Sequence, residues 1–337
     1  MIGPHTLWKA ARRYFEHRKG RRLPLICCWL ITNRCTLKCE GCYFYQRVYD
    51  EQSDLDTAQV HKILDRMIDI RLPVLYIAGG EPLMREDLFE LMEKAKRHHI
   101  LTVLYTNGLH IDEQKAALVD RFFDMAFVSI DGFASDHEIL RGKNTYEPAM
   151  DGLKLLTAGR KRAKVGINYV ITKYNADNTV AFLDFIASMN LDRIKIHPHY
   201  FPDHRPGAEQ IRPVVEKLID MKKSNPRYLI GSREYFLSWI DLIAKGQSTP
   251  CDELDSFINV GIMPDGTVSA CGSYNVPLGN LLENSFEEIL SGPLEDKLAK
   301  ASECSGCYRY DAPFVRYVFE TPLFKLSPRK ILEGLRG

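Results

Sequence analysis

The sequence lacks an apolar run long enough to cross a membrane. Its longest run, residues 23–32, is about half of the roughly 20 residues that a transmembrane helix requires. The small-residue cleavage site that ends a secretory signal peptide does not follow this run. We therefore expect a cytoplasmic protein.

Neither sign of charge is in excess, and internal repeats and low-complexity tracts are absent. The 337 residues carry 45 Lys and Arg against 44 Asp and Glu, which gives a formal net charge of +1. This balance creates no global field that would attract nucleic acid, so no nucleic-acid partner is expected. The chain is 45% hydrophobic, and it is long enough for one large α/β domain with a small appendage.

Short β-rich runs alternate with helical patterns between residues 25 and 197, which is typical of a parallel sheet covered by helices. The expected strands are residues 25–32, 74–78, 101–106, 125–130, 165–171 and 193–197. Segments such as 87–98 and 150–157 carry apolar residues at helical spacing. Six βα units are too few for a complete eight-stranded barrel. We therefore predict a partial (β/α)6 TIM-like barrel, with functional groups at the carboxyl ends of its strands.

Changes in pattern predict four segments. Residues 1–22 form a basic amphipathic helix, 23–225 the partial barrel, 226–310 a Cys-rich domain of a β-hairpin and a helix, and 311–337 an amphipathic tail. In the first segment Trp8, Ala11 and Phe15 share one helical face, while basic side chains crowd the other. Such a helix either contacts an anionic membrane peripherally or caps the bottom of the barrel.

Three of the nine cysteines, Cys35, Cys39 and Cys42, form a C-x3-C-x2-C pattern after the first expected strand. Three Cys ligands on a four-iron cluster leave one iron open to bind another molecule. Buried thiols or a zinc site are the alternatives, although zinc sites usually pair their cysteines. Cys27 and Cys28 are strand neighbours that point to opposite faces, so we expect both to pack in the core.

This pattern, at this position, resembles the signature of the radical S-adenosylmethionine (SAM) superfamily. The resemblance implies that the open iron binds SAM, and that the reduced cluster cleaves SAM to methionine and a 5′-deoxyadenosyl radical, which abstracts hydrogen from an unactivated C–H bond. It also implies a flavodoxin- or ferredoxin-type electron donor. The family usually has an aromatic residue before the third cysteine, where this chain has Gly41, and Tyr43 is expected to pack against adenine instead.

Polar residues follow the next strands at the same edge of the sheet. Gly79, Gly80 and Glu81 resemble the GGEP motif of the superfamily, which holds the SAM amino group. The remaining candidates for binding SAM or substrate are, by the same resemblance, Asn107, Ser129, Asp131, Arg141 and Asn168. Taken singly, Asn-Gly and Asp-Gly are ordinary turn signals, and an exposed arginine is usually solvated. His197 and His199, at the end of the sixth strand, are expected to line the cavity rather than to bind a metal.

The last third of the chain contains a second group of four cysteines, Cys251, Cys271, Cys304 and Cys307. Four thiolates complete a closed site, which from chemistry alone is either zinc or an iron–sulfur cluster. Residues 264–266 are expected to turn a hairpin that delivers Cys271. The spacing of Cys251, Gly266 and Cys271 resembles the opening of a SPASM or twitch domain. The resemblance implies one auxiliary 4Fe-4S cluster that transfers electrons, and hence two 4Fe-4S clusters in all.

Three functions remain open at this point. The favoured one is a radical SAM enzyme acting on a small molecule or lipid, because residues 1–22 are basic and residues 20–25 resemble the lead-in of hopanoid-pathway radical SAM proteins. The second is a peptide or protein maturase of the SPASM type. Such enzymes often carry an extra peptide-binding domain, and the residues before the first strand are too few for one. The third is a zinc-binding structural protein or an electron carrier.

Overall fold

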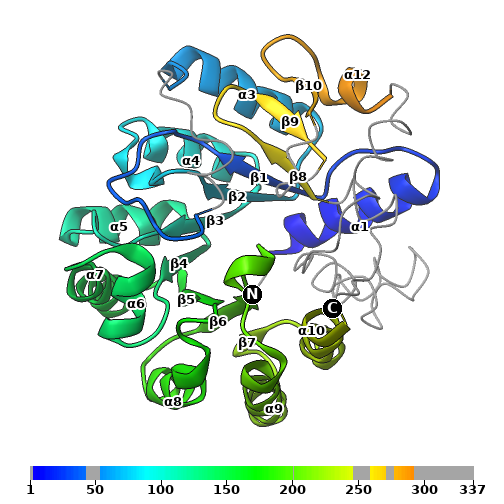
Figure 1. Ribbon diagram of the computed structural model, residues 1–337. Coiled ribbons are helices and arrows are strands. Elements are labelled where there is room, and N and C mark those ends of the chain that lie inside the picture. The colour runs from blue at the N-terminus through cyan, green and yellow to red at the C-terminus, as the bar shows by residue number, and fades with distance from the viewer. Residues whose placement is uncertain (1–2, 43–53, 200, 246–258, 271–276, 292–337) are drawn as a thin grey trace.

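The structure is a computed structural model that describes residues 3–42, 54–199, 201–245, 259–270 and 277–291. Within these residues ten strands form one sheet, in the order β10-β9-β8-β1-β2-β3-β4-β5-β6-β7. Figure 1 shows the strands at the centre and the helices in an arc outside them. The strands are β1 Ile26–Leu30, β2 Val74–Ala78, β3 Leu101–Thr106, β4 Met125–Ser129, β5 Lys164–Ile171, β6 Arg193–Pro198, β7 Leu229–Ile230, β8 Asn259–Ile262, β9 Thr267–Ser269 and β10 Pro277–Asn280.

Helices follow most of the parallel strands, as in a barrel of βα units. They are α1 Pro4–Arg18, α3 Thr57–Asp69, α4 Leu88–Arg97, α5 Glu113–Phe122, α6 Ala134–Arg141, α7 Tyr146–Gly159, α8 Ala176–Ala187, α9 Ala208–Ser224, α10 Arg233–Lys245 and α12 Phe286–Ser291, with single 3-10 turns η1 Pro82–Met84 and η2 Pro202–His204. Asp56 begins α3 with a capping box, because its side chain accepts from the Gln59 N–H while the Gln59 side chain accepts from the Asp56 N–H.

The predicted partial barrel is confirmed. Strands β1 to β6 pair in chain order and in parallel, so their carboxyl ends meet at one edge of the sheet. The strand β7 was not predicted. It is two residues long and pairs in parallel with β6 at Ile194 and Lys195, which is too short to produce a sequence period.

The predicted C-terminal hairpin is also present, and it extends the barrel sheet. The strand β8 pairs in parallel with β1 from Ile26 to Trp29, while β9 pairs antiparallel with both β8 and β10. At the turn, Thr267 N donates to Asp265 Oδ1 at 2.9 Å. The hairpin therefore continues the same sheet on the β1 side, beside the strand that leads to Cys35.

Apolar side chains form two layers, one on each side of the strands. The outer layer, between sheet and helices, contains Cys27, Trp29 and Leu64. The inner layer fills the barrel and contains Ile26, Tyr76, Val103 and Phe127, with Cys28 packed against it. The prediction that Cys27 and Cys28 pack on opposite faces is confirmed.

Helix α1 packs against the bottom of the barrel, where Ala10 joins the inner apolar layer. Arg13 is buried and donates to the carbonyl oxygen of Ile70 at the end of α3. Lys9 Nζ donates to the carbonyl oxygens of Leu72 and His98, at 3.2 and 2.7 Å. Two of the basic side chains of α1 therefore satisfy backbone carbonyls after α3 and α4, while Trp8 is 43% exposed.

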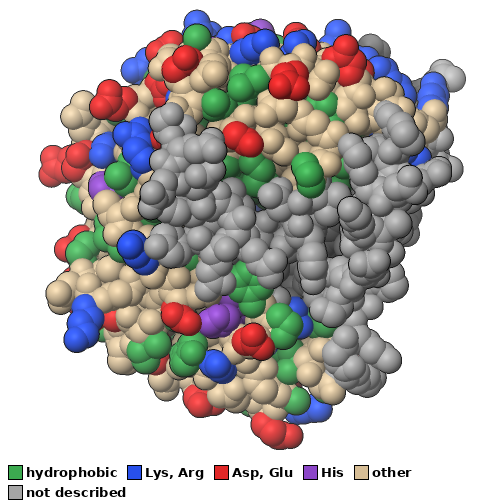
Figure 2. Space-filling view, turned by 45° about the horizontal axis from the view of Figure 1, so that its top comes forward, with side chains coloured by type: hydrophobic (Ala, Val, Ile, Leu, Met, Phe, Trp, Pro, Cys, Tyr) green, Lys and Arg blue, Asp and Glu red, His purple; other side chains and the backbone are tan. Residues whose placement is uncertain are grey.

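The surface of the described residues agrees with the balanced composition. On the face shown in Figure 2, Lys and Arg side chains are interspersed with Asp and Glu side chains. Among the described helices, none is both long enough and apolar enough to cross a membrane.

Candidate functional site

A pocket of about 180 Å³ lies at the carboxyl ends of β2, β3 and β4, beside the cysteine loop that follows β1. Most of the candidate residues that the structure describes gather here. Those that line the pocket are Cys35, Cys39, Cys42, Gly79, Gly80, Asn107, Ser129 and Arg141. Glu81, Asp131 and Asn168 are described but do not line it. In the described part of the chain, no group of three His, Cys, Asp or Glu side chains is arranged closely enough to hold a metal ion. The three thiols all line the same pocket.

The cysteine loop is held in shape by its own turn and by β6. Cys42 N donates to the carbonyl oxygen of Cys39 at 3.1 Å. His199 Nε2 donates to the carbonyl oxygen of Gly41 at 2.9 Å, while His199 Nδ1 accepts from Phe201 N at 3.1 Å. These two bonds fix the tautomer of His199. His199 therefore supports the loop that carries the thiols.

The departure at Gly41 from the usual aromatic residue has a structural cause. Gly41 has a φ of +68°, and a Cβ at this position would lie 2.7 Å from His199 Nε2. Any side chain would face both a strained backbone conformation and a clash. Glycine at residue 41 is thus what allows the loop to approach His199.

Gly79 and Gly80 allow close approach of backbone to backbone. Gly80 N donates to the carbonyl oxygen of Thr32 at 2.9 Å, and Glu81 N donates to that of Arg34 at 2.7 Å. A Cβ on Gly80 would lie 2.1 Å from the Arg34 oxygen. The glycine pair therefore joins the end of β2 to the segment that enters Cys35, and it lines the pocket at the same time.

Glu81 is fully buried, and its carboxylate is used inside the protein. It accepts from Thr106 Oγ1 and Asn107 N at 2.7 Å each, and from Leu83 N at 3.1 Å. Burial raises the pKa of Glu81, and these hydrogen bonds oppose the rise. Its carboxylate therefore positions Thr106 and Asn107 at the pocket.

Arg141 enters the pocket from the end of α6 and is held by Asp131. The Nε atom donates to Asp131 Oδ2 at 2.6 Å, and Asp131 Oδ1 accepts from Val170 N at 2.8 Å. Burial alone would lower the pKa of Arg141, but the charges of Asp131 and Cys39 outweigh it and raise that pKa. Burial raises the pKa of Cys39 to about 11, with Arg141 acting in the opposite direction. Arg141 is thus a fixed cation beside the cysteine loop.

Two of the candidate residues each have a buried polar atom with no hydrogen-bond partner within the described residues. One is Asn107 Nδ2, a donor whose side chain lines the pocket. The other is Asn168 Oδ1, an acceptor on β5 at the residue paired with Ser129 of β4. Buried polar groups are rarely left unpaired. A ligand that brings an acceptor to Asn107 and a hydroxyl to Asn168 fits this arrangement, and SAM offers both.

Sequence reasoning missed Lys195 and Tyr105 in the barrel interior. Lys195 Nζ donates to Tyr105 Oη at 3.0 Å and lies 4.3 Å from the centroid of the Tyr105 ring. Tyr105 in turn lines the pocket. The alternation of side chains along a strand could have indicated Lys195, because Lys195 and His197 lie two residues apart on β6 and therefore face the same side of the sheet. Burial, followed by the Lys195 charge, lowers the pKa of His197 to about 3.

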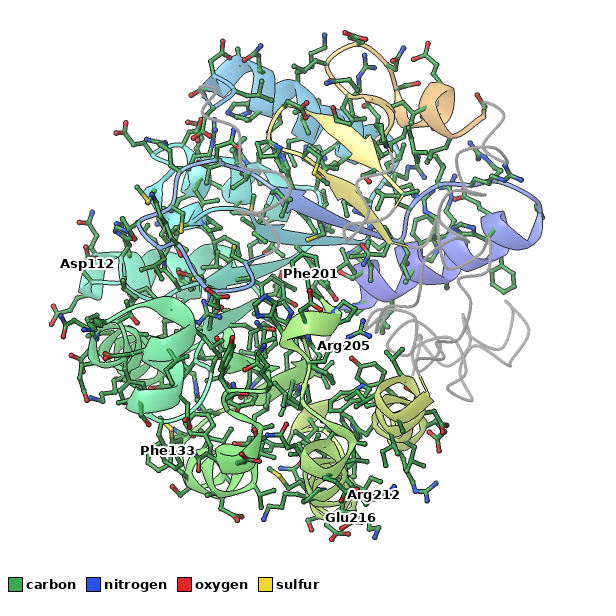
Figure 3. All side chains as sticks on the ribbon, viewed as in Figure 1. Asp112, Phe133, Phe201, Arg205, Arg212 and Glu216 are labelled. Atoms are coloured by element: carbon green, nitrogen blue, oxygen red, sulfur yellow. The ribbon has the colours of Figure 1, made fainter. Side chains whose placement is uncertain are left out.

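The segment after β6 lies near the barrel axis, where Figure 3 labels Phe201 and Arg205. Arg205 Nε donates to the carbonyl oxygen of His199 at 3.2 Å. Asp112, Phe133, Arg212 and Glu216 lie at the periphery in the same view. The buried His199 is therefore bonded on one side to the cysteine loop and on the other to this central segment.

Five candidate residues lie outside the described residues. They are Tyr43, Cys251, Cys271, Cys304 and Cys307.

Comparison with known families matches the chain in two places. Residues 29–186 match the model described as the radical SAM superfamily, and residues 251–308 match an iron-sulfur cluster-binding domain named SPASM. The first match contains the three cysteines of the pocket, and the second contains all four cysteines of the later group.

Individual relatives cover different shares of the chain. A protein named pre-heme d1 synthase from Dinoroseobacter shibae is 32% identical over 177 residues, which is 52% of this chain but only 43% of that protein. Mycofactocin maturase MftC from Mycobacterium ulcerans is 30% identical over 325 residues, covering 88% of this chain and 83% of the relative. Among solved structures, anSMEcpe with bound AdoMet has a TM-score of 0.66 at 18% identity and covers 83% of this chain and 80% of that one, a likeness of fold.

Proposed function

Since the chain belongs to the radical SAM superfamily and carries an iron-sulfur cluster-binding SPASM domain, we propose that it cleaves SAM reductively and abstracts hydrogen from a C–H bond of a small molecule that bears negative charge. As a member of this superfamily it is an enzyme that uses SAM and a 4Fe-4S cluster, with auxiliary iron–sulfur binding in its SPASM domain. When bound, these groups supply a 5′-deoxyadenosyl radical. What we propose beyond family membership is the class of substrate.

The observation that carries the proposed site is one pocket whose lining brings together the three cysteines, the glycine pair and the polar side chains of Asn107, Ser129 and Arg141. In the proposal Cys35, Cys39 and Cys42 hold the cluster. Arg141, fixed by Asp131, binds the SAM carboxylate as a charge-assisted pair. Asn107 Nδ2 and Asn168 Oδ1, both without a partner among the described residues, bind polar groups of the nucleoside. Glu81 holds the end of β3 in place, and its predicted contact with the SAM amino group remains a proposal.

The charge inside the barrel supports an anionic small molecule. Lys195 is 9% exposed and reaches the pocket through Tyr105. An ammonium group in a barrel interior favours a ligand of opposite charge, because low local dielectric strengthens their attraction. His197 stays neutral at pH 7, since its pKa is about 3, and therefore adds no second positive charge. A relative named pre-heme d1 synthase is in keeping with a small-molecule substrate.

A peptide or protein substrate is the second candidate. The MftC relative is named a maturase and matches 88% of this chain. A lipid substrate has less support than it had from sequence, because Lys9 and Arg13 of α1 are bound to backbone carbonyls. In both candidates Cys251, Cys271, Cys304 and Cys307 bind one auxiliary cluster, and a flavodoxin- or ferredoxin-type protein donates the electron.

The reaction is tested with protein purified and reconstituted without oxygen. With dithionite as reductant, the wild type is expected to release 5′-deoxyadenosine and methionine from SAM, and Cys35→Ala to release neither. The matched control is Cys28→Ala, which removes a thiol that packs against the barrel interior and does not line the pocket. Wild-type SAM cleavage by Cys35→Ala contradicts the proposal.

The substrate class is tested by comparing metabolites and peptides between a deletion strain and its parent. Under the first candidate an anionic small molecule accumulates in the deletion strain, stimulates 5′-deoxyadenosine formation in vitro, and stimulates the Lys195→Met enzyme at least tenfold less. Accumulation of an unmodified peptide instead supports the maturase.

A further inference from the structure

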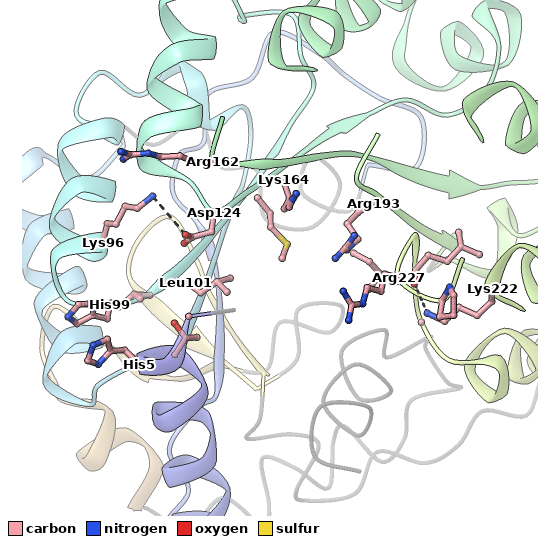
Figure 4. Close-up of a pocket in the computed structure, with 18 residues that line it drawn as sticks. His5, Lys96, His99, Leu101, Asp124, Arg162, Lys164, Arg193, Lys222 and Arg227 are labelled. Atoms are coloured by element: carbon pink, nitrogen blue, oxygen red, sulfur yellow. Dashed lines mark hydrogen bonds and ion pairs between the residues drawn. The ribbon is translucent and has the colours of Figure 1, made fainter. Parts of the chain in front are cut away.

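A second pocket, of about 400 Å³, lies at the opposite end of the barrel from the cysteine loop. Leu101, Met125, Lys164, Arg193 and Leu229 line it, and these are the first residues of β3 to β7. Gly3, His5 and Thr6 complete one side, so the start of α1 borders the pocket. Figure 4 shows these side chains around the pocket, with α1 below them.

The lining of this pocket is strongly cationic, although the chain as a whole is nearly neutral. Its charged residues are Lys96, Arg162, Lys164, Arg193, Lys222 and Arg227, against the single carboxylate of Asp124. Asp124 lies 3.8 Å from Lys96, and Lys164 pairs with Asp192 outside the lining at 2.9 Å. Asp120 Oδ1 also accepts from Arg162 N at 2.8 Å. Among the described residues the six cations therefore outnumber these three carboxylates, and a concave surface of mostly one sign concentrates its field inside the pocket.

Three guanidinium groups of the lining form no ion pair among the described residues. They belong to Arg162, Arg193 and Arg227, none of which has a carboxylate oxygen within 4.0 Å of its guanidinium nitrogens in this part of the chain. Lys222 Nζ donates to the carbonyl oxygen of Leu229 at 2.7 Å. Burial, followed by the charge of Arg193, lowers the pKa of Lys222. Lys222 and Arg193 are therefore close enough to repel one another.

The pocket is separate from the radical site. Leu101, Met125 and Ile230 line the pocket and also belong to the inner apolar layer or pack against it, together with Tyr76 and Phe127. This layer fills the barrel between the two ends. A ligand in the basic pocket is therefore not the molecule that loses hydrogen, and the pocket requires a different explanation.

We propose that the basic pocket binds an oxyanion with at least two negative charges, of the phosphate or phosphate-ester class. Guanidinium forks match the oxygen geometry of phosphate and bind it in pairs. A pocket of about 400 Å³ accommodates more than one phosphate group. A multiply charged anion also relieves the repulsion between Arg193 and Lys222.

Two sources of this chemistry are distinguishable, a free phosphate compound and the headgroup of an anionic lipid. The start of α1 forms one side of the pocket, and α1 carries the exposed Trp8 with Arg12 packed 5.7 Å from its ring centroid. An exposed tryptophan beside a basic pocket suits a membrane surface. The pocket suits a free anion equally well.

Binding of a free anion is tested by isothermal titration calorimetry of the reconstituted protein with inorganic pyrophosphate. The wild type is expected to bind pyrophosphate, with an affinity that falls as NaCl rises from 50 to 200 mM. Arg162→Ala/Arg227→Ala is expected to bind at least tenfold more weakly. Both arginines are exposed, and no described residue accepts a hydrogen bond from either side chain. The double variant is therefore expected to fold and to retain SAM cleavage.

The matched control is Lys223→Ala, which removes a positive charge beside Lys222 but outside the pocket lining. It is expected to bind pyrophosphate like the wild type. The proposal is overturned if the wild type binds neither pyrophosphate nor anionic vesicles, or if the control loses as much affinity as the double variant.

The lipid arm uses cosedimentation with phosphatidylglycerol vesicles and with neutral phosphatidylcholine vesicles. Sedimentation with the anionic vesicles alone, lost in Arg162→Ala/Arg227→Ala and displaced by pyrophosphate, identifies a lipid headgroup as the source. Pyrophosphate binding without vesicle binding identifies a free anion. Vesicle binding that the double variant retains in full overturns the assignment to this pocket.

Discussion

At the scale of single residues, the site depends on one contact between positions far apart in the chain and on one contact within a βα unit. His199 reaches Gly41 across 158 residues, and Arg141 reaches Asp131 within one βα unit. The first contact shapes the cysteine loop. The second fixes a cation at the pocket.

Gly41→Ala is expected to destabilise the loop in two ways. The positive φ alone costs a non-glycine residue about 1–2 kcal/mol, and the added Cβ would lie 2.7 Å from His199 Nε2. We expect iron per chain and SAM cleavage to fall together by at least tenfold. Gly20→Ala is the control, because Gly20 also has a positive φ but no atom within 4 Å of its added Cβ. Equal losses in the two variants would contradict the role given to His199.

Asp131→Asn is expected to weaken SAM binding without removing the cluster. The change leaves Arg141 without its carboxylate partner, and a charged hydrogen bond is worth about 1.5–3 kcal/mol. We expect the KM for SAM to rise about tenfold while iron content is unchanged. Asp136→Asn replaces a buried carboxylate that is bonded to Asn178 instead, and it should leave the KM for SAM near the wild-type value. If the two variants behave alike, Arg141 does not act through Asp131.

At the scale of elements, hydrogen bonds and ion pairs attach α1 and the starts of β5 and β6 at the bottom of the barrel. Helix α1 bonds to carbonyls after α3 and α4 through Arg13 and Lys9. Asp192, just before β6, accepts from Val165 N of β5 at 3.1 Å and pairs with Lys164 at 2.9 Å. Both attachments lie at the end of the barrel opposite the cysteines.

Arg13→Met is expected to lower the free energy of unfolding by about 2 kcal/mol, because it leaves the buried Ile70 carbonyl without its charged donor. Arg12→Met is the control, since the Arg12 side chain is 41% exposed and pairs only at the surface. Chemical unfolding of both variants measures the difference. A loss from Arg13→Met no larger than that from Arg12→Met would show that α1 is not attached through this bond.

Asp192→Asn provides a pH test of the contact between β5 and β6. Burial opposes ionisation of Asp192, but hydrogen bonds from Lys164 and Val165 outweigh it and lower the pKa of Asp192. A carboxyl pKa that is lower in the folded state stabilises the fold above the unfolded pKa of about 3.9, and this stabilisation is lost as the pH falls.

We therefore expect Asp192→Asn to reduce the free energy of unfolding by about 1 kcal/mol at pH 7, and this deficit to shrink below about pH 5. Urea unfolding from pH 7 to pH 4 measures both effects. Asp151→Asn, at an exposed pair with Lys154, should show almost no deficit at any pH. A deficit for Asp192→Asn that grows on acidification would reverse the sign derived from its pKa.

At the scale of the whole molecule, the protein has two groups of cysteines with different expected roles. We expect about eight irons per chain from two four-iron clusters. Both Cys35→Ala and Cys251→Ala should lose about four irons. Only Cys35→Ala should abolish reductive cleavage of SAM, because the auxiliary cluster is expected to be closed by protein ligands. Iron and zinc analysis of anaerobic preparations checks these counts. In Cys35→Ala the metal that remains is expected to be bound by the second group of cysteines, so zinc instead of iron in this variant would mean that the second group is a zinc site.

The grouping of Cys35, Cys39 and Cys42 at one pocket and the positions of the strands were predictable because each is encoded locally. Ligand spacing is a property of a few neighbouring residues, and the buried parallel strands are continuous apolar runs, so β2 and β3 were placed at residues 74–78 and 101–106 as the structure has them. The two-residue strand β7 has no such pattern. Lys195 and Tyr105, which meet across 90 residues, were missed because either residue alone is an ordinary strand position.

The sequence by itself therefore determined the chemistry available to this protein: which thiols are grouped, which strands form, and that their polar ends share one edge. Only the tertiary structure decided which of these groups meet. Curvature of the sheet into a partial barrel brought Arg141 and Asn107 into one pocket with the thiols, placed His199 next to Gly41, and gathered cations from five separate segments at the other end of the barrel. The physical reason is that the chemistry of a ligand depends on residue type and on spacing along the chain. Hydrogen bonds, ion pairs and the electrostatic field of a pocket depend instead on distances in space.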